Sequence, residues 1–265
     1  MQATDPETAA ELARLYDLDL ADDPGDLDLY LALAGRADGR VVELCAGSGR
    51  IAIPLAMAGF DVTAVDIDPA MLARAGERAR RAGTEMRGRL EFVTGDLHRI
   101  TVPGSGSFGL GIIGLNSILL LGGPRIQRHA MAVLADLVAP GGLVVVDAWL
   151  PFAEDLVRFD GRLGLEWVRI DPDTGRTVVK TTAAWYDSST GAVTLTTIFD
   201  ASSPGGSVER RVREDTLHLL SADALRLYAE DAGLEVEVVA GGYGMTPLEP
   251  GDGRAVLVAR RPHAS

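Results

Sequence analysis

The sequence predicts an α/β fold in which strands and helices alternate, and two stretches carry this prediction. Val41–Leu44 is an apolar run of strand-forming residues broken only by Glu43, Cys45–Gly49 is a turn of small residues, and a helical pattern begins at Arg50. A second apolar strand, Asp61–Val65, follows that helix and ends in an acidic residue, Asp66. Repeated strand, turn and helix units build a sheet that is covered by helices.

The other elements of the sheet layer follow in order along the chain. Further strands are predicted at Leu90–Val93, Phe108–Leu115, Leu143–Val146, Leu234–Val239 and Ala255–Arg260. Helices are predicted at Thr8–Tyr16, Asp26–Leu33, Met71–Ala82, Pro124–Val138 and Ala222–Ala232. With the two strands above, the sheet contains seven strands.

The stretch from Arg162 to His218 has a different pattern, because its apolar residues alternate instead of recurring at helical spacing. Turn sequences at Asp171–Gly175 and Asp187–Gly191 separate the alternating runs. The pattern predicts an antiparallel meander of three to four strands, inserted after the fifth strand of the sheet.

Composition narrows the class of protein. The formal net charge of the 265 residues is -13, which argues against nucleic acid as a partner, since that binding depends on basic side chains. The single cysteine, Cys45, permits no internal disulfide and fits a reducing compartment. Met1–Glu11 is polar and acidic, so we expect no signal peptide. No apolar run reaches the ~18 residues of a membrane span. We therefore expect a cytoplasmic protein without a membrane partner.

The glycine turn and Asp66 together predict a nucleoside-binding site. Bare backbone at Gly47 and Gly49 allows close approach of a ligand, and the start of the following helix favours a negative group. Asp66 lies 19 residues after Gly47, the spacing at which a carboxylate accepts hydrogen bonds from ribose hydroxyls. The run Gly47–Ala52 also satisfies the pattern G-x-G-x-x-A, so an NAD-dependent oxidoreductase is one alternative.

Three further features resemble the class I S-adenosylmethionine (SAM)-dependent methyltransferases. The family pattern reads V-L-D-L-G-C-G-T-G, then V-x-G-V-D-x-S-x-x-M-L, then G-D. Here Glu43 lies within the first strand, Asp66–Leu72 continues directly into a helix, and Gly95–Leu97 follows the third strand. The resemblance extends from about Tyr16 to Asp147 and resumes after Ser221, so it covers most of the predicted sheet.

The resemblance implies a Rossmann-like, doubly wound, mostly parallel sheet with an inserted β-meander and an N-terminal helical lid. The implied domains are a lid (1–36), a SAM-binding core (37–150), an insertion (151–220), and the last helix and strands of the core (221–265). The implied activity is transfer of the methyl group of SAM to an O, N or C atom of a small molecule, in natural-product biosynthesis. Alternatives are a SAM-binding enzyme of non-methyl chemistry, such as a cyclase, and a cofactor-binding interaction protein without catalysis.

The resemblance also assigns cofactor-binding positions. Asp66 is expected to bind the ribose and Asp96 the adenine amino group, with Tyr16 and Tyr30 over the methionine end. The complete expected set is Tyr16, Tyr30, Glu43, Cys45, Ala46, Gly47, Gly49, Arg50, Asp66, Ile67, Met71, Asp96, Leu97 and Leu115. Because cysteine tolerates fewer backbone conformations than glycine, we expect a negative φ at Cys45, and we assign it no redox role.

Candidates for acid–base or substrate-orienting chemistry are His218, Asp147 and Asn116, while His98 is expected on a loop near the adenine side. The acceptor pocket is expected at the carboxyl ends of the fourth and fifth strands, lined by Trp149, Phe152, Trp185, Tyr186 and Tyr243. An apolar lining suits an aromatic or polyketide-like acceptor better than a free sugar. The insertion is expected either to cover this pocket or to form the surface of a homodimer. No metal-ligand cluster is evident in the sequence.

Overall fold

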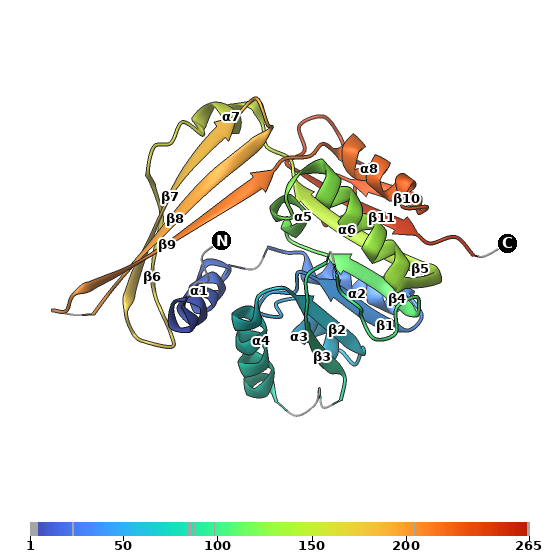
Figure 1. The fold of residues 1–265 in the computed structure, drawn as a ribbon, viewed down its shortest axis with the longest axis horizontal. Helices are drawn as coiled ribbons and strands as arrows, with labels where there is room; N and C mark the ends of the chain where they lie inside the picture. Colours follow the sequence, from blue (N-terminus) through green and yellow to red (C-terminus); the bar gives the residue numbers. More distant parts are fainter. Residues whose placement is uncertain are drawn as a thin grey trace. The chain divides into compact units, whose positions relative to one another are not determined.

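The computed structural model describes residues 5–22, 24–83, 86, 88–97, 99–203 and 205–263. The chain folds into two compact units (Figure 1). The larger unit comprises Asp23–Leu150 and Leu220–Ser265, and the smaller one comprises Met1–Asp22 and Pro151–Leu219. Each unit therefore combines segments that are distant in the sequence.

The larger unit contains a seven-stranded sheet with the order β10-β11-β5-β4-β1-β2-β3. Its strands are β1 (Arg40–Leu44), β2 (Val62–Asp66), β3 (Leu90–Thr94), β4 (Phe108–Ile113), β5 (Val138–Trp149), β10 (Glu235–Ala240) and β11 (Arg254–Arg260). The neighbours from β5 to β3 pair in parallel, whereas β11 is antiparallel to both β5 and β10. The prediction of a seven-stranded, mostly parallel sheet is confirmed.

Helices pack on both faces of this sheet. They are α2 (Leu27–Arg36), α3 (Ala52–Met57), α4 (Pro69–Ala82), α5 (Ser117–Leu120), α6 (Gly123–Leu137) and α8 (Ala222–Asp231). Apolar residues of α2 and α3 form one buried cluster with Leu110 and Ile112 of β4. Gly111, between them, faces the opposite side, where an added Cβ would lie 2.8 Å from Leu134 of α6. Glycine at this position therefore allows α6 to pack closely on the sheet.

The smaller unit contains a four-stranded antiparallel sheet with the order β6-β7-β8-β9. Its elements are α1 (Pro6–Asp19), α7 (Ala153–Arg158), β6 (Gly164–Ile170), β7 (Thr177–Asp187), β8 (Ala192–Ser202) and β9 (Val208–His218). The predicted inserted meander is therefore present and has four strands. Helix α1 starts at Pro6 because the Asp5 side chain caps it, accepting hydrogen bonds from the backbone of Glu7 and Thr8.

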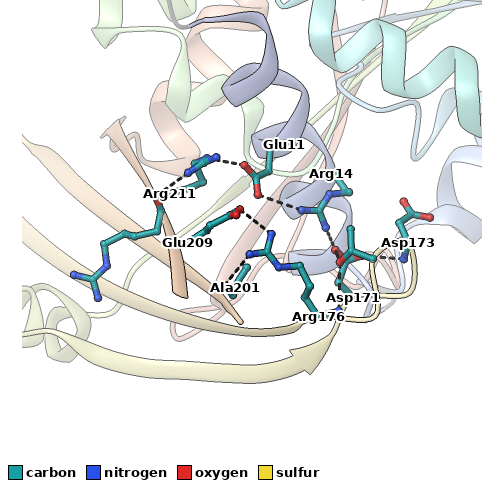
Figure 2. Close-up of polar contacts among 10 residues, drawn as sticks. Glu11, Arg14, Asp171, Asp173, Arg176, Ala201, Glu209 and Arg211 are labelled. Atoms are coloured by element: carbon teal, nitrogen blue, oxygen red, sulfur yellow. Dashed lines mark hydrogen bonds and ion pairs between the residues drawn. The ribbon is translucent and has the colours of Figure 1, made fainter. Parts of the chain in front are cut away.

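Helix α1 packs on one face of the four-stranded sheet through apolar and charged contacts. Its apolar side joins a buried cluster made of Leu15, Leu18, Val178, Phe199 and Ala201. Around this cluster, ion pairs join Glu11 to Arg211 and Arg14 to Asp171, as Figure 2 shows. Lys180 binds Asp19 at the end of the helix, with 2.7 Å from Nζ to either carboxylate oxygen. The first helix of the chain is thus an integral part of the inserted sheet.

The opposite face of that sheet exposes apolar side chains. Strand pairing places Leu165, Val168 and Ile170 of β6 opposite the odd-numbered residues of β7, the side that also carries Trp185. All four of these side chains are more than half exposed, Trp185 at 59% and Ile170 at 71%. This uncovered face is compatible with the prediction of a homodimer surface but does not test it.

The N-terminal segment differs from the single lid expected for residues 1–36. Helix α1 belongs to the smaller unit, whereas α2 belongs to the larger one. The reason is packing, because Tyr30 and Leu33 of α2 are buried in the cluster that contains α3 and the seven-stranded sheet. Within the described ranges, no helix has both the length and the apolar character needed to cross a membrane.

Candidate functional site

The site lies where the direction of chain winding reverses in the seven-stranded sheet. Strands β1 and β4 are neighbours, and the chain proceeds from β1 to β2 and β3 on one side and from β4 to β5 on the other. In open α/β sheets, ligands bind beside the carboxyl ends of the strands at this reversal. These ends are continued by Cys45–Gly49 after β1 and by Gly114–Asn116 after β4.

Left-handed backbone marks both strand ends. Among the described residues, four non-glycine positions have a positive φ, and three of them are Cys45 at 60°, Leu115 at 48° and Asn116 at 64°. The predicted negative φ at Cys45 is wrong, because the turn after β1 requires the left-handed region at its first residue. Each such position costs about 1–2 kcal/mol for a residue other than glycine. Burial raises the pKa of the Cys45 thiol to about 12, consistent with the absence of an assigned redox role.

Asp66 connects the end of β2 to the glycine turn after β1. Its Oδ2 accepts a hydrogen bond from the backbone N–H of Gly47 at 2.7 Å, and its Oδ1 accepts one from that of Asp68 at 2.9 Å. A carboxylate offers about four acceptor positions, so both oxygens can accept further hydrogen bonds. Burial raises the pKa of Asp66, and the two backbone donors oppose that effect.

The end of β3 lies beside Asp66. Asp66 pairs with Thr94, and its carbonyl oxygen accepts a hydrogen bond from the Gly95 N–H at 2.9 Å. The expected adenine-binding residues Asp96 and Leu97 therefore lie on the same edge of the sheet. Of the expected residues in the helix after β2, Ile67 is 66% exposed, and Met71 lies in the first turn of α4.

Glu43 is a buried carboxylate with one oxygen that accepts no hydrogen bond in the described structure. Its side chain on β1 is only 3% exposed, and its Oε2 has no hydrogen-bond partner in the described structure. Burial raises the pKa of Glu43 to about 8, while Arg50 and the Ala52 N–H lower it. Buried polar atoms are rarely unpaired, so this oxygen suits a site that receives a cationic group.

Arg50 has a partner that sequence reasoning missed. Its guanidinium binds Asp26 in a two-point contact, with 2.7 Å from Nη1 to Oδ1 and 2.6 Å from Nη2 to Oδ2. The Asp26 side chain is fully buried. Asp26 was predicted only as the first residue of a helix, and it lies directly before α2, where its side chain makes no capping bond. Arg50 thereby ties the start of α2 to the glycine turn.

A second polar cluster joins the ends of β4 and β5. The fully buried Asp147 accepts hydrogen bonds from the hydroxyls of Tyr30 and Tyr243, from the Leu115 N–H and from Arg254. Asn116, the next residue after Leu115, accepts bonds from the Trp149 N–H at 2.6 Å and from Arg254 at 3.0 Å. The structure therefore brings together six expected site residues, Asp147, Asn116, Leu115, Tyr30, Tyr243 and Trp149. Arg254 had no recognisable signal in the sequence.

The other expected residues belong to the smaller unit. They are Tyr16 on α1, Phe152 before α7, Trp185 and Tyr186 on β7, and His218 at the end of β9. Trp185 is 59% exposed and Phe152 is 46% exposed. Their roles toward cofactor and substrate stay predictions. His98 lies outside the described residues. Over the part of the chain that the structure describes, no three His, Cys, Asp or Glu side chains are grouped to hold a metal ion.

Comparison with known proteins finds a methyltransferase-domain match within the larger unit. Residues 41–142 match the family model of the methyltransferase domain. The uncharacterized protein Rv1403c of Mycobacterium tuberculosis is 35% identical over 122 residues, which are 44% of this chain and 39% of that protein. The chain thus matches about two fifths of the length of this curated relative.

Solved structures show the same fold over nearly the whole chain. The CcbJ methyltransferase from Streptomyces caelestis is 24% identical, with a TM-score of 0.72 and coverage of 98% of this chain and 97% of that one. The sugar N-methyltransferase KedS8 from Streptoalloteichus sp ATCC 53650 is 20% identical, with a TM-score of 0.71 and coverage of 94% and 93%. Residues 41–142 therefore match a methyltransferase domain, and the chain has the Rossmann-like fold of these methyltransferase structures, as the sequence motifs predicted.

The raised pKa of Glu43 predicts an unusual pH dependence of stability. The carboxyl titrates near its ordinary 4.5 in the unfolded chain and near 8 in the folded protein. Between these values the folded state binds one more proton, so stability falls as pH rises. We expect the free energy of unfolding, measured with urea at pH 5 and pH 8, to decrease more in the wild type than in Glu43→Gln. An equal decrease in both proteins would contradict a raised pKa at Glu43.

Proposed function

We propose that this protein transfers the methyl group of SAM to an N, O or C atom of a small-molecule acceptor in secondary metabolism. The observation that carries the proposal is the 2.7 Å hydrogen bond between the Asp66 carboxylate and the Gly47 N–H. It places an acceptor for ribose hydroxyls directly beside a glycine turn, at the reversal point of the sheet. A nucleoside with a charged substituent fits both features.

The residues at this edge fit SAM. Asp66 would bind the ribose, Asp96 would bind the adenine amino group, and the unpaired Glu43 Oε2 would face the cationic methionine portion. When bound, SAM supplies a methyl group activated for attack by a nucleophile. The contribution of the protein is then to align the acceptor and to exclude water.

The acceptor class is supported by the similar structures. KedS8 is a sugar N-methyltransferase, so an amino group on a sugar of a natural product is the first acceptor to test. A neutral amine is already nucleophilic, so this reaction needs no general base. An aromatic or polyketide-like acceptor is the second class to test, following the expected apolar pocket. Homodimer formation and a cytoplasmic location stay predictions.

The test is an acceptor screen with the purified full-length chain. SAM is combined with amino sugars, aminoglycosides or phenolic polyketides, and formation of S-adenosylhomocysteine (SAH) is measured. We expect SAH to form in an acceptor-dependent manner, with a matching mass increase of one methylene in the product. The screen also includes Asp66→Ala. Asp68→Ala is its matched control, because the Asp68 side chain caps α4.

Three results would contradict the proposal. Failure of the wild type to bind either SAM or SAH in calorimetry would remove the cofactor assignment. Copurification of NAD, detected by mass spectrometry, would favour the oxidoreductase alternative. Acceptor-independent conversion of SAM would instead favour a SAM-binding enzyme of non-methyl chemistry.

A further inference from the structure

Asp147 has donors on both of its carboxylate oxygens. Oδ1 accepts hydrogen bonds from the Tyr30 hydroxyl and the Leu115 N–H, each at 2.6 Å. Oδ2 accepts one from the Tyr243 hydroxyl at 3.0 Å and another from Arg254 Nη1. Because a carboxylate has about four lone-pair positions, these four donors occupy its acceptor capacity. Asp147 can accept a proton from a substrate only by giving up one of these bonds.

The four donors come from four different segments of the larger unit. Tyr30 lies on α2, Leu115 follows β4, Tyr243 lies between β10 and β11, and Arg254 begins β11. The Arg254 guanidinium also lies 4.8 Å from the centre of the Tyr243 ring, so these two donors stabilise each other's position. A single buried carboxylate thus holds together the helix, the loops and the strand that meet at this edge of the sheet.

Two of the contacts concern backbone that is held in an unfavourable conformation. Leu115 and Asn116 are consecutive residues with φ of 48° and 64°. Such conformations persist in residues other than glycine only where the surroundings impose them. Asp147 binds the Leu115 N–H, and Arg254 connects Asp147 to the Asn116 side chain. The pair of residues follows β4, next to the turn after β1 where the cofactor is proposed to bind.

We propose that Asp147 is a positioning residue that holds Leu115 and Asn116 in their left-handed conformation, and that it is not a general base. This inference rests on the proposed function, because the backbone it positions borders the proposed cofactor site. It replaces the expectation from the sequence that Asp147 acts directly in catalysis. Methyl transfer then depends on Asp147 through the geometry of the edge, while the acceptor supplies its own nucleophile.

The first measurement concerns the ligand-free protein and does not depend on activity. In Asp147→Asn, one carboxylate oxygen becomes an NH₂ group, which cannot accept the bonds of two of the four donors. We expect amide hydrogen exchange in a peptide spanning residues 114–119 to accelerate about tenfold or more, as expected for the loss of one charge-assisted hydrogen bond. A peptide from β2 serves as the internal reference and should exchange at the wild-type rate. Wild-type exchange at 114–119 in the variant would overturn the inference.

The second measurement separates positioning from proton transfer. In Asp147→Asn we expect SAH affinity to fall about tenfold. The plot of kcat against pH should keep both the acidic and the basic limb of the wild-type plot. Loss of the acidic limb with unchanged SAH affinity would identify Asp147 as the base and overturn the inference. If the wild type itself binds no SAH, the proposed function fails, whereas the exchange experiment still tests the role of Asp147.

A milder variant keeps the inference testable if Asp147→Asn fails to fold. Tyr243→Phe removes one donor and leaves the carboxylate charge in place, so we expect a smaller change in the same direction in both measurements. Its effect and that of Asp147→Asn should be non-additive in the double variant, because both act on one cluster. Tyr228→Phe, at a buried tyrosine of α8, is the matched control and should leave both measurements unchanged. Full additivity would overturn the shared positioning role.

Discussion

Gly47→Val should lower SAM affinity by at least about a hundredfold, equivalent to about 3 kcal/mol. Gly47 has a φ of 55°, and its N–H donates to Asp66 at 2.7 Å. A β-branched side chain at positive φ is strongly disfavoured, and its bulk would occupy the space in which the cofactor approaches bare backbone. Isothermal titration calorimetry with SAM and SAH measures the loss directly.

The control for this variant must carry the same backbone strain away from the site. Gly233 has a φ of 77°, lies in the same unit after α8, and has no atom within 4 Å of an added Cβ. Gly233→Val should therefore lose stability but retain wild-type affinity for SAM. A folded Gly47→Val protein with wild-type affinity would show that the glycine turn is not where the cofactor binds.

Asp66→Ala is the second variant with a large expected effect. Removing the carboxylate should lower SAM affinity about ten- to hundredfold for each ribose bond that is lost, since a charge-assisted hydrogen bond contributes about 1.5–3 kcal/mol. The variant also removes the acceptor for the N–H groups of Gly47 and Asp68. Burial raises the pKa of Asp66 above its ordinary value, so wild-type affinity should fall as pH is lowered through that pKa.

Asp68→Ala is matched to Asp66→Ala in charge and position. The Asp68 side chain accepts a hydrogen bond from the Ala70 N–H at 2.8 Å and caps α4. Its loss should cost about 1 kcal/mol of stability without changing SAM affinity beyond about twofold. Equal losses of affinity in the two variants would indicate a general disturbance of the β2–α4 turn and contradict a ribose-binding role for Asp66.

The expected results at Gly47 and Asp66 depend on features that local sequence can encode. The strand before the turn, the glycines within it and the acidic residue 19 positions later are read from hydrophobic pattern and spacing. The change from helical to alternating periodicity at Arg162 likewise predicted the inserted meander, and the four-stranded sheet confirms that prediction. A period of two or 3.6 residues reflects which side chains share one face, so it is visible without knowledge of the remainder of the chain.

Only the tertiary structure decided how distant segments meet. The Tyr30 hydroxyl binds a carboxylate 117 residues away, and Arg254 binds the same group across 107 residues. No periodicity encodes such pairs, so Asp147 was expected in catalysis, whereas its four donors support the proposed positioning role. The Arg50–Asp26 pair was missed for the same reason, whereas the positive φ of Cys45 follows from the geometry of the turn after β1. The sequence alone predicted the elements, the cofactor class and a candidate ribose acceptor, while contacts between remote residues determined the backbone conformation and the charges around them.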